Sequence, residues 1–152
     1  PFFPVEIPLE LVPLSQDDKE EEHVFDCYHE GVKVRYFPLK HTTTCFGYRL
    51  EYEGKSIAYV TDTVSRTDSP YLQHLNDLDV LFHEVNSLHE EGSAPFGHTD
   101  VDNLIKIANI VKPKTLVLIH HNPNGNRLEL LEAVKQGYPN TLVANDKEFL
   151  EI

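Results

Sequence analysis

Asp62 is the residue in this sequence whose position most clearly asks for a chemical explanation. It follows the run SIAYV, whose β-branched and aromatic residues predict a buried strand that ends near Asp62. A carboxylate at the end of a buried strand is costly unless it is paired or bound to a cation. We therefore interpret Asp62 as a metal ligand. The alternative is a turn or helix N-cap, a common use of Asp after a strand.

Histidines follow other apolar runs at equivalent positions. His41 follows VKVRYFPLK, His83 ends DVLF, and His120 with His121 follows TLVLI. Side chains at the same ends of neighbouring strands can converge, and that edge of an α/β sheet is where ligands usually bind. Imidazole nitrogen and carboxylate oxygen, without thiolates, suit zinc, manganese or iron in a catalytic site. His83 has a second interpretation, as hydrogen-bonding support for its neighbours.

Glu84 and His98, in the loop GHTD, form a second candidate pair. If they meet, the carboxylate would orient the imidazole and raise its pKa, which equips it as a general acid near neutral pH. The alternative is an ordinary surface carboxylate and a loop histidine. Histidines that lack a strand-end position are assigned structural roles: His23, His29, His74 and His89.

The elements that must position these residues are strands in the first part of the chain and alternating strands and helices in the second. Strands are predicted within 23–39 and 45–62 as two hairpins, at 79–85 and 115–119, and in the tail segments TLVAN and EFLEI. The first of these hairpins is preceded by an edge strand or extended arm over 1–14 and a solvated acidic loop over 15–23. This order predicts an α/β chain with a mixed sheet and at least one helical layer.

Hydrophobic spacing also predicts which faces are buried. Helices are expected within 65–78, from Thr99 or Asp100 to Pro113, and over 127–136. In the last of these helices the inward residues are Leu128, Leu131 and Val134. The strand after Cys45 is predicted to be half-buried, because two sets of residues alternate along it. One set is Phe46, Tyr48, Leu50 and Tyr52, and the other is Gly47, Arg49 and Glu51.

Length and composition limit the classes of protein. The 152 residues, 40% of them apolar, suit a single domain over 1–152. No apolar run approaches the roughly 20 residues of a membrane span, and two cysteines outside any CxxC pair favour a reducing cytoplasm. The formal charge of −12 argues against broad binding to a phosphate backbone, although a divalent metal can reverse the local sign for RNA or a nucleotide. The chain starts at Pro1 and has no methionine, so we expect a piece of a longer product.

Five motifs in order suggest a family: HTTTCFGYRL, IAYVTDT, VLFHEVN, FGHTD and LVLIHHNP. Over about residues 37–123 they resemble the C-terminal half of metallo-β-lactamase-fold hydrolases, nearest the phosphodiesterase branch that includes ribonuclease Z. The resemblance implies an αββα sandwich, of which this chain is the second half, and two divalent metal ions, zinc or alternatively manganese or iron. It implies that His41, Asp62 and His120 are metal ligands, with Asp62 bridging. His98 would act near the leaving group with Glu84 as its acidic partner, and His121 would support a ligand or contact substrate.

One family motif is missing. The pattern HxHxDH, which in the family supplies further metal ligands and the Asp that acts as base, does not occur in these 152 residues. We therefore expect the chain to be inactive alone and to be completed by the N-terminal half of the same fold or by a partner chain, with a homodimer as another way to cover its open face. The implied function is hydrolysis of a phosphodiester in RNA or a nucleotide. The alternatives are hydrolysis of a thioester, lactone or other acyl bond, and a non-catalytic half-fold used for binding or assembly.

Overall fold

The computed structural model describes residues 25–26 and 31–152. Within them one mixed sheet has seven strands, and its strand order follows the chain order. The strands are β1 (Phe25–Asp26), β2 (Lys33–Leu39), β3 (Cys45–Tyr52), β4 (Lys55–Val60), β5 (Val80–Glu84), β6 (Thr115–Ile119) and β7 (Thr141–Val143). The predicted α/β class is therefore confirmed. The expected arm over 1–14 and acidic loop over 15–23 lie outside the described residues.

Strand direction explains why the candidate residues meet at one edge. Neighbours from β1 to β4 are antiparallel, and neighbours from β4 to β7 are parallel. Because two antiparallel steps restore the direction, β2 runs the same way as β4, β5 and β6. The carboxyl ends of these four strands therefore lie at the same edge of the sheet. The residues at or just after those ends are His41, Asp62, Glu84 and His120.

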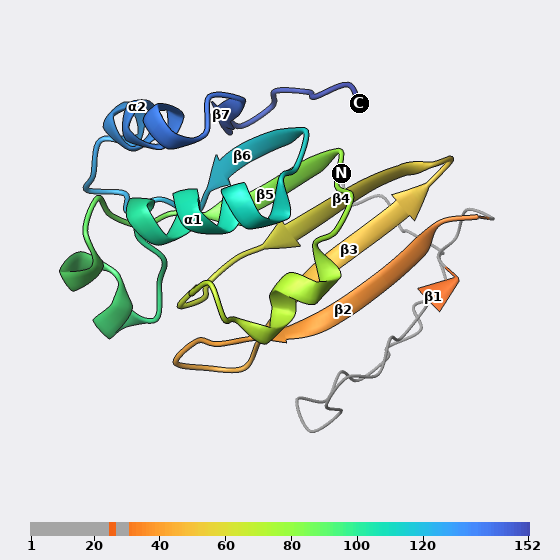
Figure 1. Ribbon diagram of the computed structural model, residues 1–152, viewed down its shortest axis with the longest axis horizontal. Helices are drawn as coiled ribbons and strands as arrows, with labels where there is room; N and C mark the ends of the chain where they lie inside the picture. The colour runs from red at the N-terminus through yellow and green to blue at the C-terminus, as the bar shows by residue number, and fades with distance from the viewer. Residues whose placement is uncertain (1–24, 27–30) are drawn as a thin grey trace, which may run out of the picture.

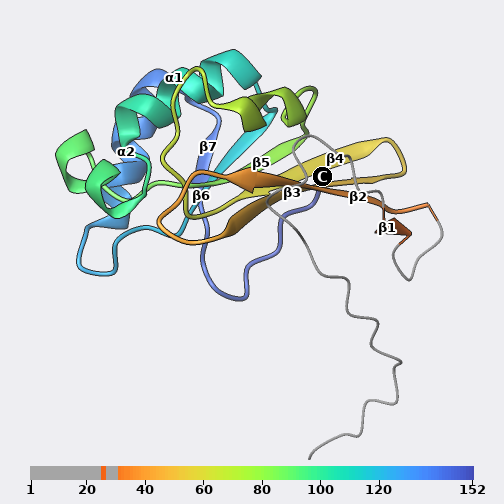
Figure 2. The same ribbon diagram turned by 90° about the horizontal axis from the view of Figure 1, so that it is seen from below.

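Helices cover one face of the sheet (Figures 1 and 2). The helix α1 (Val101–Val111) connects β5 to β6, and α2 (Arg127–Gly137) connects β6 to β7. The 3-10 helix η1 (Pro70–His74) lies on the same face, whereas η2 (Glu90–Gly92) and η3 (Ala94–Phe96) lie beyond the end of β5, in the loop that leads to α1. Asp100 caps α1 by accepting a hydrogen bond from the backbone N–H of Asn103, and Asn126 caps α2. These caps fix where each helix starts relative to the strand before it.

The core lies between this helical layer and the sheet. Its fully buried side chains include Phe37, Ala58, Val60, Leu81, Leu104, Ile107, Leu116 and Leu118. Burying an aliphatic side chain of this size contributes about 1.5 to 3 kcal/mol relative to leaving it exposed. The core therefore holds the central strands firmly, and with them the strand ends that carry the candidate site.

The other face of the sheet carries a second apolar cluster. Val80, Val117 and Ile119 are buried there, with partly buried Ile57 and Phe82 packed against them. No helix of the described residues covers this face, and the segment after β7 passes along it (Figure 2). An apolar sheet face without a helical layer is what half of a two-layered sandwich presents.

The alternation predicted for β3 is present, and the set of residues that faces the core is the one with Gly47 and Arg49. Gly47 and Arg49 are buried, whereas Phe46, Tyr48 and Leu50 are only half-buried. A Cβ on Gly47 would lie 2.3 Å from the Phe37 ring, so only glycine fits beneath that ring. The Arg49 guanidinium donates to the backbone oxygens of His74 and Asn76, 3.0 and 2.5 Å away. A buried arginine with backbone acceptors can therefore occupy the core face.

Of three other expectations, one is confirmed and two need correction. The short helix predicted within 65–78 is present as the 3-10 helix η1. Leu128 in α2 is 57% exposed, and the buried residues of this helix are Leu130 and the predicted Val134. The tail segment EFLEI forms no strand in the described structure, where Phe149 is 97% exposed.

Candidate metal centre

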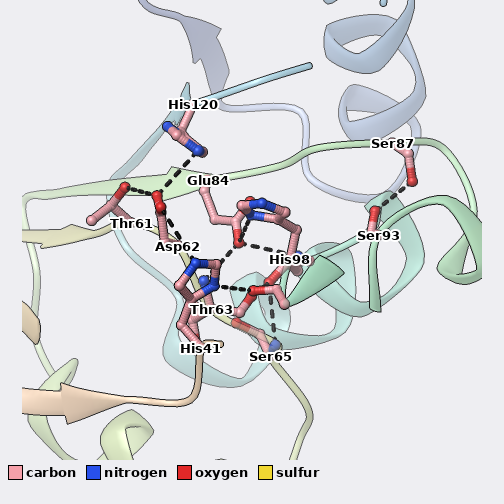
Figure 3. A network of polar contacts seen from close by, with 12 residues as sticks. His41, Thr61, Asp62, Thr63, Ser65, Glu84, Ser87, Ser93, His98 and His120 are labelled. Carbon is pink, nitrogen blue, oxygen red and sulfur yellow. Dashed lines mark hydrogen bonds and ion pairs between the residues drawn. The ribbon is translucent and has the colours of Figure 1, made fainter. Parts of the chain in front are cut away.

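Asp62 lies between two imidazole rings at the carboxyl edge of the sheet (Figure 3). Its Oδ1 is 3.1 Å from Nε2 of His120, and its Oδ2 is 3.8 Å from Nε2 of His41. Each carboxylate oxygen therefore faces a different histidine. The structure brings together the three residues that the sequence interprets as metal ligands.

Local contacts orient these side chains. Nδ1 of His41 donates to the backbone oxygen of Gly97, 2.9 Å away, which leaves Nε2 as the ring nitrogen with a free lone pair. Oδ1 of Asp62 also accepts from the Thr61 hydroxyl at 2.7 Å. His120 adopts a left-handed backbone conformation with φ of 49°, an uncommon state for a residue other than glycine. Such outliers concentrate at functional sites.

Asp62 is held ionised by its surroundings. Partial burial opposes ionisation, but the Thr61 hydrogen bond and the nearby His120 and His41 outweigh it and keep the pKa of Asp62 below its ordinary value. The carboxylate is therefore available as an anionic ligand at neutral pH.

The donor set fits divalent metal in chemistry but supplies only part of a centre. Two imidazole Nε2 atoms that flank the two oxygens of one carboxylate match zinc, manganese or iron. Among the described residues, however, no group of three or more His, Cys, Asp or Glu side chains is arranged as a ready metal-binding cluster. His41 and His120 each meet Asp62 as a separate pair. Further ligands are needed, as the absence of HxHxDH from the sequence implies.

Glu84 and His98 meet next to this centre. Glu84 is fully buried, and its Oε1 accepts from the backbone N–H groups of Thr63 and Thr99 at 2.8 and 3.1 Å. Nδ1 of His98 lies 3.2 Å from each carboxylate oxygen of Glu84. The His98 ring lies 5.2 Å from the His41 ring and 5.4 Å from the His120 ring, centroid to centroid. All five candidate residues therefore form one cluster.

The protonation of the pair differs from the sequence-based expectation. Burial raises the pKa of Glu84 to about 8. Burial, followed by the neighbouring His120, lowers the pKa of His98. The expected rise in the pKa of His98 is wrong, because removing the ring from water outweighs the attraction of the Asp62 carboxylate. At neutral pH the pair can hold one proton on the carboxyl group while the imidazole stays uncharged.

His83 does not join the ligands but anchors a buried hydrogen-bond network. Its Nδ1 donates to the backbone oxygen of Glu84 at 2.7 Å, so its Nε2 must accept, and the Tyr71 hydroxyl lies 3.0 Å away. Ser65 Oγ lies 2.7 Å from that hydroxyl. Burial lowers the pKa of His83 to about 4, so the ring is neutral. The structure thus gives His83 the hydrogen-bonding role among its two interpretations.

A second set of contacts joins this network to the Glu84 carboxylate. The hydroxyl of Thr99 donates to the backbone oxygen of Thr63 at 2.7 Å and accepts from the backbone N–H of Ser65 at 3.2 Å. The segments around 63–65, 83–84 and 97–99 are therefore tied together around one buried carboxylate. The sequence shows no signal for Tyr71 or Ser65, because hydrogen bonds between distant segments are decided by packing.

Two further histidines have defined places. His121 is half-buried, and its Nδ1 has no hydrogen-bond partner among the described residues. Burial and the nearby Arg127 lower its pKa. His74 stacks on the Phe37 ring at 4.9 Å, in keeping with its structural assignment.

Comparisons with known proteins show the family of this chain. The family described as "Beta-lactamase superfamily domain" matches residues 2–121. Ribonuclease Z of Saccharolobus solfataricus is 28% identical over 103 residues, which cover 65% of this chain and 34% of that protein. The chain thus spans about a third of the length of the curated relatives it matches.

Solved structures share the fold at lower identity. Human tRNase Z, short form, superposes with a TM-score of 0.66 and 21% identity over 84% of this chain and 44% of that one. Zn²⁺-bound PqqB from Methylobacterium extorquens superposes with a TM-score of 0.72 and 16% identity over 86% of this chain and 54% of that one. Both superpositions leave about half of the known structure unmatched, as expected for half of the fold. The chain belongs to the beta-lactamase superfamily and has a metallo-β-lactamase fold near the ribonuclease Z branch.

Proposed function

We propose that this chain is the C-terminal half of a metal-dependent phosphodiesterase that acts on RNA or a nucleotide phosphodiester. The observation that carries the proposal is the position of Asp62, whose two oxygens face His120 and His41 beside the His98–Glu84 pair. The curated relatives named ribonuclease Z favour a phosphodiester over other bonds.

Two divalent metal ions, zinc or alternatively manganese or iron, are the cofactors that this proposal requires. His41, Asp62 and His120 would hold them together with ligands from outside these residues. Bound metal would supply a Lewis acid for the phosphoryl oxygens and would activate water as the nucleophile.

The chain's own residues would manage the proton of the leaving group. When water attacks phosphorus, the bond to the leaving oxygen breaks and that oxygen needs a proton. With Nδ1 of His98 against Glu84, its Nε2 is the ring nitrogen left for the substrate. The pair would deliver its proton through His98 to the leaving oxygen, and Glu84 would stabilise the ring as it changes charge.

The proposal also includes a second half that completes the site. The sheet face with Val80, Val117 and Ile119 is apolar and lacks a helical layer in the described structure. An N-terminal half of the same fold, or a partner chain, would cover this face and contribute the missing ligands. A second copy of this chain is the alternative cover, but it would lack HxHxDH as well.

Turnover by the complete protein tests this function. The metal-loaded protein should hydrolyse bis(p-nitrophenyl) phosphate faster than a thioester or a lactone. Asp62→Asn should abolish this activity, and Asp68→Asn should not, because Asp68 is an exposed aspartate of the same loop. Rapid acyl hydrolysis without diester turnover would favour the acyl hydrolase, and no turnover of any of the three would favour the binding module.

A further inference from the structure

A cleft lies beside the candidate centre and contains none of its five residues. Its volume is about 400 Å³, within the range of small-molecule sites. Its walls come from the loop after β5 and from the loop after β6 with the start of α2. Asn86 lies two residues after Glu84, and Asn122 lies two residues after His120. A substrate whose reacting group sits at the centre would therefore reach this cleft next.

We propose that this cleft binds the nucleoside part of the substrate, through the side-chain amides of Asn86, Asn122 and Asn126. The proposal rests on the proposed function and adds to it the chemical class that the enzyme would recognise beside the scissile bond. Three observations support it: the orientation of the amides, the charge of the cleft, and its apolar surfaces.

Backbone contacts fix the orientation of two of the amides. Oδ1 of Asn122 accepts from the backbone N–H of Asn124 at 2.9 Å, and Oδ1 of Asn126 accepts from that of Leu128 at 3.1 Å. The NH₂ groups of both residues are therefore left for a ligand. The Asn86 amide makes no hydrogen bond within the described part of the chain, so it offers both a donor and an acceptor. Amide side chains of this kind pair with the edges of bases.

The charge of the cleft argues against a second phosphate as its ligand. Glu91 and Glu129 line it, and no Lys or Arg of the described residues does. Two carboxylates repel an anion but can accept hydrogen bonds from a neutral base or sugar. The ligand expected here is therefore uncharged and rich in hydrogen-bonding groups.

Apolar and aromatic groups provide surfaces for a flat ring. Leu88 and Leu130 both line the cleft. Leu88 is partly buried against the core, and Leu130 is buried. His89 adds an exposed imidazole ring, a group on which bases stack. A base has both the planar faces and the polar edges that these two kinds of lining residue match.

Kinetics with two matched substrates test the proposal in the complete, metal-loaded protein. The p-nitrophenyl phosphodiester of thymidine and methyl p-nitrophenyl phosphate share a leaving group and differ only in the nucleoside. Asn86→Ala removes the free amide, and Asn122→Asp keeps the oxygen that accepts from Asn124 while removing the NH₂ donors. Each variant should raise KM for the thymidine ester roughly tenfold and leave the methyl ester unchanged.

Asn124→Ala is the matched control, because Asn124 lies on the same loop but does not line the cleft. It should change neither substrate. Equal effects of the cleft variants on both substrates, or no effect on the thymidine ester, would overturn the nucleoside assignment while leaving the phosphodiesterase intact.

A binding measurement decides the question even if no diester is hydrolysed. Thymidine alone is titrated into the isotope-labelled complete protein while the side-chain NH₂ signals of the asparagines are followed by NMR. Saturable shifts at Asn86, Asn122 and Asn126, with none at Asn124, are expected. Shifts elsewhere, or none, would reject the site. If wild-type protein fails to hydrolyse methyl p-nitrophenyl phosphate, the proposed function has failed, and this titration still judges the cleft.

Discussion

Nδ1 of His98 lies 3.2 Å from both carboxylate oxygens of Glu84, a fully buried residue whose pKa burial raises to about 8. The geometry couples a ring beside the candidate metal ligands to a carboxyl group that water cannot reach. Such a pair can store a proton near neutral pH and pass it to a substrate atom.

Removing the His98 ring should impair turnover without loss of metal. His98→Ala in the complete protein should lower kcat by roughly 10² to 10⁴, the usual contribution of a positioned general acid. Its metal content, measured by elemental analysis, should match wild type. Asp62→Ala is the contrasting variant and should lose metal. If His98→Ala also loses metal, His98 belongs among the ligands.

Two substitutions of Glu84 should distinguish its role in proton transfer from its role in the stability of the fold. Glu84→Gln keeps an oxygen that can accept from the backbone N–H groups of Thr63 and Thr99, but it removes the acidic proton of the carboxyl group. We expect a large loss in kcat with little change in stability. Glu84→Ala should also destabilise the fold, by about 1 to 3 kcal/mol for each buried N–H left unpaired. Denaturant unfolding of both variants checks this, and equal stabilities would contradict it.

Gly97 should control the orientation of His41. Gly97 has φ of 86°, and a Cβ there would lie 2.6 Å from Nδ1 of His41. Gly97→Ala should displace the ring and weaken metal binding roughly 10- to 100-fold, the range seen when a contact that orients a ligand is lost. Gly54→Ala is the matched control, with φ of 77° and open space around the new methyl group. Equal metal affinities in the two variants would contradict this role of the Gly97–His41 contact, because the two substitutions share the backbone strain and differ in that contact.

His83 should make stability depend on pH in a defined direction. Its pKa is about 4 in the folded chain, because burial disfavours the charged ring, and 6.5 is the ordinary value. Below the ordinary value the unfolded chain takes up a proton that the folded chain does not. The contribution of His83 to the free energy of unfolding is therefore present above about pH 6.5 and is lost as the pH falls toward 4. The total loss is about 3 kcal/mol.

The comparison that isolates this effect is wild type against His83→Gln, in which no ring titrates. Unfolding free energies from denaturant titrations give the difference between the two proteins at each pH. That difference should shrink as the pH falls through this range, because only wild type loses the contribution. A difference independent of pH would contradict the assignment of a neutral, buried His83.

The 152 residues alone should be a poor enzyme. With His41, Asp62 and His120 but no HxHxDH, two metals would share too few protein ligands, since a catalytic zinc usually has three of its own. Expressed by itself, the chain should bind zinc or manganese weakly and show no diester turnover. It should also associate through its open apolar sheet face. A soluble, active monomer with two metals would refute this expectation.

The sequence predicts the five-residue cluster well for a physical reason. His41, Asp62, Glu84 and His120 are at or just past the ends of strands that run in one direction, so the sheet topology brings them to one edge. His98 is reached through the loop that leads into α1. Their roles as ligands and acid remain predictions.

Other features could not be read from the sequence, because packing between distant segments decides them. The buried face of β3 depends on the Phe37 ring above Gly47, and the His83 network depends on Tyr71 from η1. The direction of the His98 pKa depends on how deeply the ring is buried. Residue types and spacing do not contain that information.

Metal content of the complete protein tests the central claim most directly. Elemental analysis of the purified protein should find about two divalent ions per chain, the number that a two-metal hydrolase requires, and Asp62→Ala should lose most of them. Asp68→Ala should retain them, because Asp68 is an exposed aspartate of the same loop. A complete protein without bound divalent metal, or an Asp62→Ala variant with the full amount, would contradict the account.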